Sequence, residues 1–324
     1  MSVSLRAGVV GVGSLGQHHA RIYGEIPGVR LVGIVDSDPR RAGEIAARHG
    51  CRVFPDAASL AAEVDLASVA TPTTAHQPVA EVLLAAGVAT LVEKPLAGDI
   101  AEGRSLVALA RRQGVPLMVG HTERFNPAVS ALLGQTRDPR FIEIHRLAPF
   151  VPRSLDVDVI LDLMIHDLDL CRVLLSRAEV QSFDASGTAA LTERIDIASV
   201  RLRFADGAAA NLTASRISQE RIRRVRVFEI GAFHACDTVN GTASTFRVQR
   251  EADAPPRIVG EELTLPPGEP LGRELAAFCQ AVAAGDRVPV PGEDGLAALE
   301  LALEIRDDIE SQLRRYQPGG NSGR

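Results

Sequence analysis

The sequence predicts a doubly wound parallel sheet followed by an α+β domain with a mostly antiparallel open sheet. From residue 6 to residue 120, near-continuous apolar strands alternate with amphipathic helices, as in a parallel sheet covered on both faces. After Gly120, short strands of alternating polarity follow one another directly, which is typical of antiparallel sheets. The 324 residues accommodate two domains. We expect them at residues 1–120 and 121–324, with the C-terminal helices packing back on the first.

In the first domain, apolar runs bounded by turn residues predict the strands, at residues 6–13, 29–36, 51–54, 64–72, 88–95 and 115–120. Amphipathic segments between them predict helices at residues 14–23, 38–50, 74–87 and 101–114. The second of these helices has the clearest end signals. Asp38 is its expected N-cap, Pro39 takes the first helical position, and Gly50 is the C-terminal stop.

In the second domain, alternating patterns predict strands at residues 140–147, 180–187, 197–204, 207–215, 223–231 and 244–250. Asp206 and Gly207 stand between two of these patterns and indicate a β-hairpin. Helices are expected at residues 159–175, 272–285 and 295–316. This half therefore reads as an antiparallel sheet with one early helix and two closing helices.

Composition excludes several classes of function. The net charge of −6 gives no indication of nucleic-acid binding, and the basic run at 221–226 is expected to be one solvated face of a strand. No stretch approaches the roughly 18 apolar residues that span a bilayer, and the N-terminus does not resemble a signal peptide. The cysteines lack metal or disulfide spacing, so we expect reduced thiols in a cytoplasmic protein; they are Cys51, Cys171, Cys236 and Cys279.

The stretch VGVGSLGQHHARI contains the pattern G-x-G-x-x-G at Gly11, Gly13 and Gly16. The pattern alone is weak, but here it follows a predicted strand and opens a predicted helix, with Asp36 ending the next strand. Gly11 would permit a tight turn, Gly13 would let a diphosphate approach the backbone, and Gly16 would let the helix pack closely. The helix N-terminus would face the phosphates. This context predicts a Rossmann dinucleotide-binding loop.

Asp36 is expected to accept hydrogen bonds from the adenosine ribose and to repel a 2′-phosphate, which favours NAD over NADP. Arg40 and Arg41 follow closely and would soften that preference, although exposed helix charges are the alternative interpretation. Other cofactor contacts are expected from residues in the glycine loop or beyond the carboxyl ends of strands. These are Ser14, Leu15, Thr71, Pro72, His76 and Glu93.

A second group of residues has catalytic chemistry. Lys94 ends the fifth predicted strand in the sequence VEKP, where nicotinamide and substrate should meet. Asp162 and His166 lie one helical turn apart, so the carboxylate would orient the imidazole and raise its basicity. Such a pair alone is more often structural than catalytic. A metal site formed by His166, Asp167 and Asp169 has no further ligand cluster to support it, so no metal is predicted.

These motifs together resemble the Gfo/Idh/MocA oxidoreductases over nearly the whole chain. The resemblance implies that Lys94 of E-K-P is catalytic and that Asp162 and His166 of D-x-x-x-H face the substrate carbinol. It also implies that the Lys94–Pro95 bond shapes the loop that presents the lysine. One departure is the stretch at 156–161, DVDVIL, where many members have a glycine pair. Substrate contacts near that point therefore do not transfer directly.

Two further stretches, at 120–129 and 149–170, look like the family branch that oxidises UDP-N-acetylglucosamine at C3, in pathways to the diamino sugars of lipid A. This narrower resemblance makes Arg124, Asn126, Arg153 and Ser154 candidate substrate contacts, beside Lys94 and His166. For Arg124 and Asn126, a turn leading into a helix at Pro127 is an equal alternative.

The mechanism implied is oxidation of a sugar hydroxyl bound between Lys94 and His166. His166 would take the hydroxyl proton, steadied by Asp162, while Lys94 stabilises the developing negative charge and NAD accepts hydride. The alternatives are an NAD-dependent glycoside hydrolase of the same family, a free-sugar or inositol dehydrogenase, and a dinucleotide sensor without turnover. The expected partners are a homodimer or homotetramer of this chain and a PLP aminotransferase acting on the product.

Overall fold

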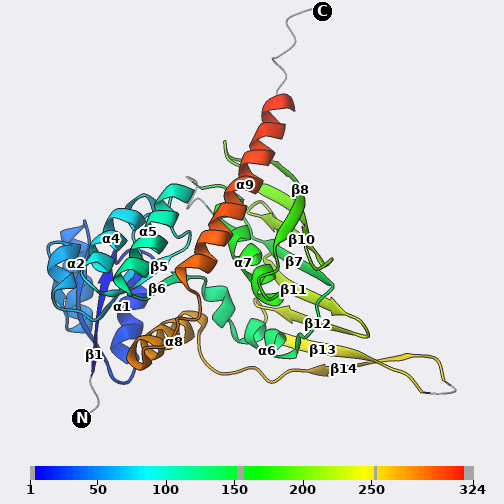
Figure 1. Ribbon diagram of the computed structural model, residues 1–324, viewed down its shortest axis with the longest axis horizontal. Helices are drawn as coiled ribbons and strands as arrows, with labels where there is room; N and C mark the ends of the chain where they lie inside the picture. Colours follow the sequence, from blue (N-terminus) through cyan, green and yellow to red (C-terminus); the bar gives the residue numbers. More distant parts are fainter. Residues whose placement is uncertain (1–3, 152–156, 252–253, 317–324) are drawn as a thin grey trace, which may run out of the picture. The chain divides into compact units, whose positions relative to one another are not determined.

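The computed structural model describes residues 4–151, 157–251 and 254–316 (Figure 1). The chain divides into two compact units, and each is discontinuous in sequence. The first unit comprises Met1–Thr122 and Glu269–Leu299, and the second comprises Glu123–Gly268 and Glu300–Arg324. None of the described helices is long and apolar enough to cross a membrane.

The first unit contains a six-stranded parallel sheet in the order β3-β2-β1-β4-β5-β6. The chain moves outward from β1 in one direction and from β4 in the other, so the order reverses between these two strands. This is the doubly wound topology that the sequence predicts. The strands are β1 (Leu5–Val10), β2 (Val29–Val35), β3 (Arg52–Val53), β4 (Leu66–Val69), β5 (Ala89–Glu93) and β6 (Leu117–Gly120).

Because crossovers between parallel strands are right-handed as a rule, the strand order places α1 and α2 on one face of this sheet and α4 and α5 on the other. The end signals of α2 are confirmed: Asp38 accepts the backbone N–H groups of Arg40 and Arg41, and Gly50 is left-handed at φ 63°. A short helix capped by Asp56, α3, was not predicted. The helices are α1 (Gly16–Glu25), α2 (Pro39–His49), α3 (Ala57–Ala61), η1 (Thr73–Ala75), α4 (His76–Ala85), α5 (Ile100–Gln113) and α8 (Pro270–Ala284).

Helix α9 (Gly292–Tyr316) begins in the first unit and continues into the second. Its first turns pack tightly on the parallel sheet, because a Cβ atom at Gly295 would lie 2.4 Å from Val119 Cγ2. A Cβ atom at Gly292 would likewise lie 2.7 Å from Leu117 Cδ2. The C-terminal segment thus completes the core of the N-terminal unit.

The second unit contains an eight-stranded sheet in the order β14-β13-β12-β11-β7-β10-β9-β8. Every neighbouring pair is antiparallel except β7 and β10, which confirms a mostly antiparallel sheet. Strand β12 and the edge strand β14 were not predicted from the sequence. The strands are β7 (Phe141–Leu147), β8 (Val180–Thr188), β9 (Ile197–Phe204), β10 (Ala209–Ser215), β11 (Ile222–Glu229), β12 (Ala232–Asp237), β13 (Thr242–Gln249) and β14 (Arg257–Glu262).

One face of this sheet is buried under the unit's helices. Along β9, Ala198, Val200 and Leu202 are buried while Arg201 and Arg203 are exposed, the alternation expected of a half-covered strand. The hairpin joining β9 to β10 turns at Gly207, which has φ 85°. The helices are η2 (Thr122–Phe125), which starts in the first unit, then α6 (Pro127–Gln135), the π-helical turn η3 (Ile160–Met164) and α7 (Ile165–Leu174).

Candidate active site

The glycine loop lies at the switch point of the parallel sheet, between β1 and α1 (Figure 1). Gly11 has φ 84°, and a Cβ atom there would lie 2.8 Å from the carbonyl oxygen of Ala70. A Cβ atom at Gly16 would lie 1.8 Å from the carbonyl oxygen of Gly11, so neither position accepts a side chain. A Cβ atom at Gly13 would have 3.5 Å to its nearest neighbour, Arg41 Nη1. No side chain caps helix α1. This open cradle of backbone N–H groups fits a diphosphate.

Asp36 lies beside this cradle at the end of β2. Its carboxylate oxygens accept the backbone N–H groups of Val12 and Asp38, each at 2.8 Å. Arg41 Nη1 lies 3.7 Å from the same carboxylate, whereas Arg40 pairs with Glu44 in solvent. Asp36 therefore holds the glycine loop and still has lone pairs for a ribose hydroxyl, and Arg41 is the arginine that faces the loop.

We expect Asp36→Ala to weaken NAD binding by about 1–2 kcal/mol, the scale of charged hydrogen bonds. The variant should also show a smaller preference for NAD over NADP. Because Asp36 also supports the loop, the ratio of the two dissociation constants is the decisive measurement. Thermal melting would show that the variant is folded. A wild-type preference for NADP would contradict this role and assign phosphate reading to Arg40 or Arg41, of which Arg41 faces the loop.

The carboxyl ends of β4 and β5 bring further predicted residues into one region of the first unit. His76 Nε2 lies 3.0 Å from the carbonyl oxygen of Thr71, and its Nδ1 lies 2.8 Å from that of Pro95. The buried hydroxyl of Thr71 has no hydrogen-bond partner among the described residues, which suits a cofactor contact. Glu93 is buried, Lys94 is half-buried, and the peptide bond between Lys94 and Pro95 is cis.

Lys94 has a property that sequence reasoning missed. Of the 35 lysine and arginine residues in the chain, it is the only lysine. Everywhere else the chain uses arginine, whose guanidinium is permanently charged, planar and broad, whereas a lysine amine is compact and exchanges protons. This one side-chain amine stands at the point where parallel sheets bind their ligands. Counting the lysines in the sequence would have been enough to single out Lys94.

In the second unit, Asp162 lies in the π-helical turn and His166 in the first turn of α7. Both are half-buried, while Asp167 and Asp169 on the same helix are almost inaccessible to solvent. The sequence predicted one regular helix here; the first five residues are instead π-helical. Asp162 and His166 thus occupy the partly exposed side of a helix whose opposite side is buried.

Two buried ion pairs hold α7. Arg146 of β7 donates to Asp167 Oδ1 at 2.6 Å and to Glu123 Oε2 at 3.0 Å. Burial opposes the charge of Arg146, yet these two carboxylates outweigh it and keep the pKa of the guanidinium above its ordinary value. Arg124 forms a bidentate pair with Asp169. The described residues contain no group of three ligands suited to a metal ion.

Two predicted substrate contacts therefore have structural partners in this unit. The Arg124 guanidinium is held by Asp169, and Asn126 accepts the N–H of Ala128 as the N-cap of α6. The turn before Pro127 that the sequence offered as an alternative is thus present. Whether either residue also meets substrate stays a prediction. Arg153 and Ser154 lie outside the described residues.

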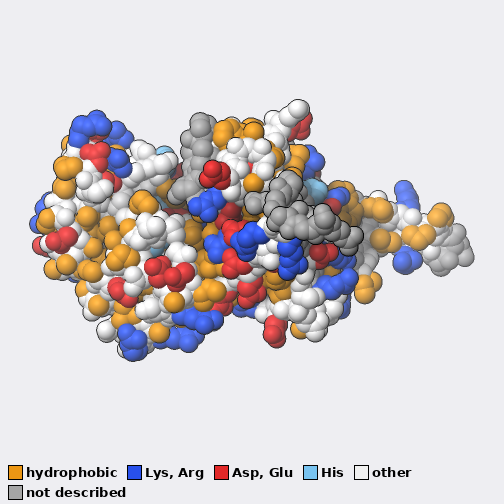
Figure 2. Space-filling view, turned by 90° about the horizontal axis from the view of Figure 1, so that it is seen from above, with side chains coloured by type: hydrophobic (Ala, Val, Ile, Leu, Met, Phe, Trp, Pro, Cys, Tyr) orange, Lys and Arg blue, Asp and Glu red, His pale blue; other side chains and the backbone are white. Residues whose placement is uncertain are grey.

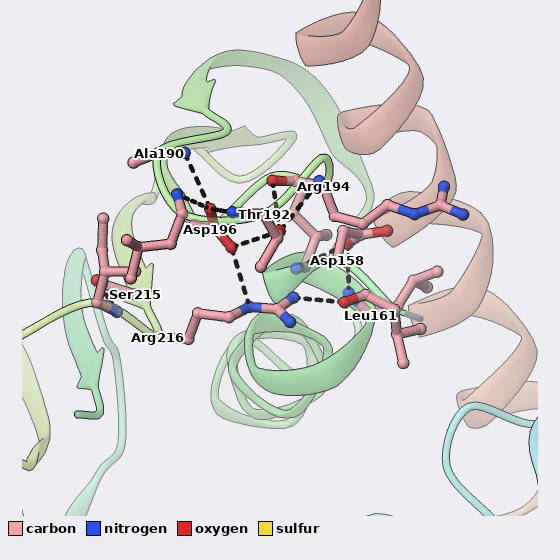
Figure 3. Close-up of polar contacts among 12 residues, drawn as sticks. Asp158, Leu161, Ala190, Thr192, Arg194, Asp196, Ser215 and Arg216 are labelled. Atoms are coloured by element: carbon pink, nitrogen blue, oxygen red, sulfur yellow. Dashed lines mark hydrogen bonds and ion pairs between the residues drawn. The ribbon is translucent and has the colours of Figure 1, made fainter. Parts of the chain in front are cut away.

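A polar network fixes the start of the helix that carries Asp162 (Figure 3). Asp158 Oδ1 accepts the N–H groups of Ile160 and Leu161, at 2.8 and 3.0 Å. Arg216 at the end of β10 donates to the carbonyl oxygen of Val157 and pairs with Asp196. The cap at Asp158 stands in the DVDVIL stretch, so this chain secures the helix start with a carboxylate.

Asp196 is the far end of this network. Burial alone would raise the pKa of Asp196, but the N–H groups of residues 190–192 and the Thr192 hydroxyl outweigh it and hold the pKa below its ordinary value. Four hydrogen-bond donors and Arg216 thus converge on one buried carboxylate.

We expect Asp196→Asn to lower the free energy of unfolding by about 3 kcal/mol, because it removes the buried negative charge on which Arg216 and four hydrogen-bond donors converge. The lowered pKa means that Asp196 stabilises the fold above the ordinary aspartate pKa of about 3.9, and that this is lost as the pH falls through the folded-state value. The difference in melting temperature between the wild type and Asp196→Asn should therefore be present at neutral pH and disappear in acid. The exposed Asp184→Asn is the control. A difference that does not depend on pH would contradict the assignment.

The fold and these residues define an oxidoreductase with an NAD-binding Rossmann domain. Residues 5–121 match the family model described as "Oxidoreductase family, NAD-binding Rossmann fold", and residues 129–230 match the "GFO/IDH/MocA C-terminal domain". The chain belongs to the Gfo/Idh/MocA oxidoreductase family.

Relatives in the family differ in what they act on. UDP-N-acetylglucosamine 3-dehydrogenase of Acidithiobacillus ferrooxidans is 41% identical over 317 residues, which cover 97% of this chain and 100% of that protein. A solved structure of that enzyme has a TM-score of 0.89 and covers 96% of this chain and 99% of its own. Inositol 2-dehydrogenase of Rhizobium meliloti is 29% identical, covering 93% of this chain and 95% of that protein.

Proposed function

We propose that this protein oxidises the C3 hydroxyl of UDP-N-acetylglucosamine, or of a close relative, using NAD. The observation that carries the proposal is the likeness to UDP-N-acetylglucosamine 3-dehydrogenase, which extends over 97% of the chain at 41% identity. The inositol 2-dehydrogenase covers a similar share of the chain at only 29% identity. The glycine cradle, Asp36 and the lone amine of Lys94 supply the chemistry that such an oxidation needs.

Bound NAD would supply the hydride acceptor. Lys94 holds the hydroxyl oxygen and stabilises the negative charge that develops as the proton leaves. His166 accepts that proton, and Asp162, one turn earlier on the same helix, orients the imidazole. Ser14, Leu15, Thr71, Pro72, His76 and Glu93 remain the proposed cofactor contacts, with Asp36 on the ribose.

The diphosphate of a nucleotide sugar also needs cationic partners. Arg124 is committed to Asp169, whereas Arg223 of β11 lies on the buried face of the sheet, directly opposite Arg146. No described carboxylate forms an ion pair with Arg223, and burial, together with Arg146, lowers its pKa. The basic run at 221–226, which the sequence predicted to be solvated, is only partly solvated. Arg224 and Arg226 are exposed, whereas Arg223 is not. We assign Arg223 to a substrate phosphate.

The test is to incubate the protein with NAD and UDP-N-acetylglucosamine, adding a PLP aminotransferase that draws off the ketone. We expect NADH and an amino-sugar product, with the bond from sugar to UDP intact. Arg223→Gln should raise the KM for the nucleotide sugar roughly tenfold, the scale of one charged hydrogen bond, while the neighbouring Arg224→Gln should not. Turnover only on a free sugar or inositol would refute the substrate, and cleavage of a glycosidic bond would identify a hydrolase.

A homo-oligomer fits the outer face of the antiparallel sheet. Phe141, Phe228, Phe233 and Phe246 stand opposite one another across four strands, with ring centroids 4.3 to 5.7 Å apart. Beside them, hydrophobic and basic side chains mix on the β13–β14 hairpin at the right of Figure 2, where Ile258 is 70% exposed. We propose that a second copy covers this row in a homodimer or homotetramer acting in the cytoplasm, where its four unpaired cysteines would stay reduced.

Phe233→Arg is expected to dissociate this oligomer, because it places a charge in the middle of a row of apolar rings. Light scattering at matched concentrations would report the mass of the particle. Val53→Arg, an exposed apolar position on the parallel sheet, is the control that should keep the wild-type mass. An unchanged mass for Phe233→Arg would place the interface elsewhere.

A further inference from the structure

Two buried histidines contact the residues on either side of Lys94. His19 of α1 reaches Glu93, and His76 of α4 reaches Pro95. Both histidines are at most 1% exposed, although Lys94 between them is half-buried. We propose that His19 and His76 are positioning residues that hold the Lys94 loop in its working conformation. This inference rests on the role proposed for Lys94.

His19 acts through the side chain of Glu93. Its Nε2 lies 2.9 Å from Glu93 Oε1, and a carboxylate only accepts, so Nε2 carries the proton. The other oxygen of Glu93 accepts the backbone N–H of Lys94 at 3.3 Å. Space for this carboxylate exists because its partner on β6 is Gly120, where a Cβ atom would lie 2.8 Å from Glu93 Oε2. The helix whose N-terminus forms the phosphate cradle is thereby linked to the backbone of the lysine.

His76 acts from the other side. Its ring lies between two carbonyl oxygens, with Nδ1 2.8 Å from Pro95 and Nε2 3.0 Å from Thr71. Burial lowers the pKa of His76, so the ring is neutral near pH 7 and has a single N–H to donate. It therefore ties the loop after β5 to the end of β4, with one of the two carbonyls accepting at a time.

A purely structural histidine would affect folding and cofactor binding without acting on the lysine in particular. The two interpretations separate because Lys94 is the only lysine, so amine-directed labelling followed by peptide mass spectrometry reports on this one side chain. The labelling needs no substrate and is done on the full chain with NAD bound. It is compared with kcat and with the KM for NAD.

Glutamine and asparagine variants give opposite expectations at the two positions. A glutamine amide reaches the position of Nε2 and an asparagine amide that of Nδ1. His19→Gln should therefore keep the bond to Glu93 and His19→Asn should lose it, whereas His76→Asn should keep the bond to Pro95 and His76→Gln should lose it. The two variants that lose their bond should lower kcat roughly tenfold to a hundredfold, the cost of small misplacements. They should also change the labelling rate of Lys94 severalfold. In His19→Asn, which replaces no proposed cofactor contact, the KM for NAD should stay within about twofold of wild type.

His18 supplies the control, because it is adjacent to His19 but exposed. His18→Asn and His18→Gln should leave both kcat and labelling unchanged. Unchanged labelling and kcat in His19→Asn would overturn the role of His19, and a larger loss in His76→Asn than in His76→Gln would show that His76 serves Thr71 instead. If Lys94→Ala keeps its turnover, the proposed function fails, while the labelling order of the histidine variants still decides whether the loop is held as inferred.

Discussion

Replacement of Lys94 by arginine is expected to abolish most turnover although the positive charge is kept. The guanidinium is permanently protonated, and its planar fork is too broad to occupy the position of a single ammonium group. Losing one donor to a developing oxyanion lowers kcat by roughly 10²- to 10³-fold. Stopped-flow kinetics would give kcat, and a fluorescence titration should show an NAD dissociation constant within about twofold of wild type, a change of about 0.4 kcal/mol.

The matching control is the reverse exchange at an exposed arginine. Arg112→Lys, at the end of α5, changes the same two residue types away from the candidate site and should leave kcat unchanged. Lys94→Ala should resemble Lys94→Arg, because both remove the amine. A Lys94→Arg enzyme with half of the wild-type kcat would show that charge alone suffices and would remove the argument from the lone lysine.

His166→Asn is expected to reduce kcat by roughly 10²- to 10⁴-fold, the range of general base catalysis, and to remove the acid limb of the pH–rate profile. In the wild type the rate should rise with pH, because only a neutral imidazole accepts the hydroxyl proton. Asp162→Asn keeps the base but loses its orienting carboxylate, so its kcat should fall less and its limb should remain.

The same acid limb in His166→Asn would transfer the role of base to another group. Asp184→Asn, an exposed carboxylate of the same unit, is the control for Asp162→Asn and should leave the profile unchanged. A primary kinetic isotope effect with substrate deuterated at the oxidised carbon would confirm that the profile reports the chemical step.

Features fixed by neighbours in the sequence were predictable, and features fixed by distant residues were not. The glycine loop and the ends of α2 depend on steric limits and caps within a few residues, and both were found as expected. The arginine pairs of Asp167 and Asp169 come from Arg146 and Arg124, far away in the chain. The periodicity of the α7 sequence therefore could not predict these ion pairs.

Strand parity explains the error at the basic run. The run also contains Ile222 and Val225, which differ by an odd number of residues and so lie on opposite faces of β11. The buried side is set by Val225 and Val227, which places Arg223 inward. The missed strand β14 has a different cause. All of its residues are exposed, so no hydrophobic pattern marks it, and pairing with β13 alone defines it.

The discontinuous first unit has a consequence for synthesis on the ribosome. Translation delivers the whole parallel sheet before the antiparallel domain, whereas α8 and the start of α9, which complete the first unit, are made only after that domain. Until then the surface that receives Gly292 and Gly295, formed by Leu117 and Val119, has no cover from α9. This surface of the nascent parallel sheet stays uncovered while the entire antiparallel domain is translated. We therefore expect the nascent chain to need chaperone protection in that interval.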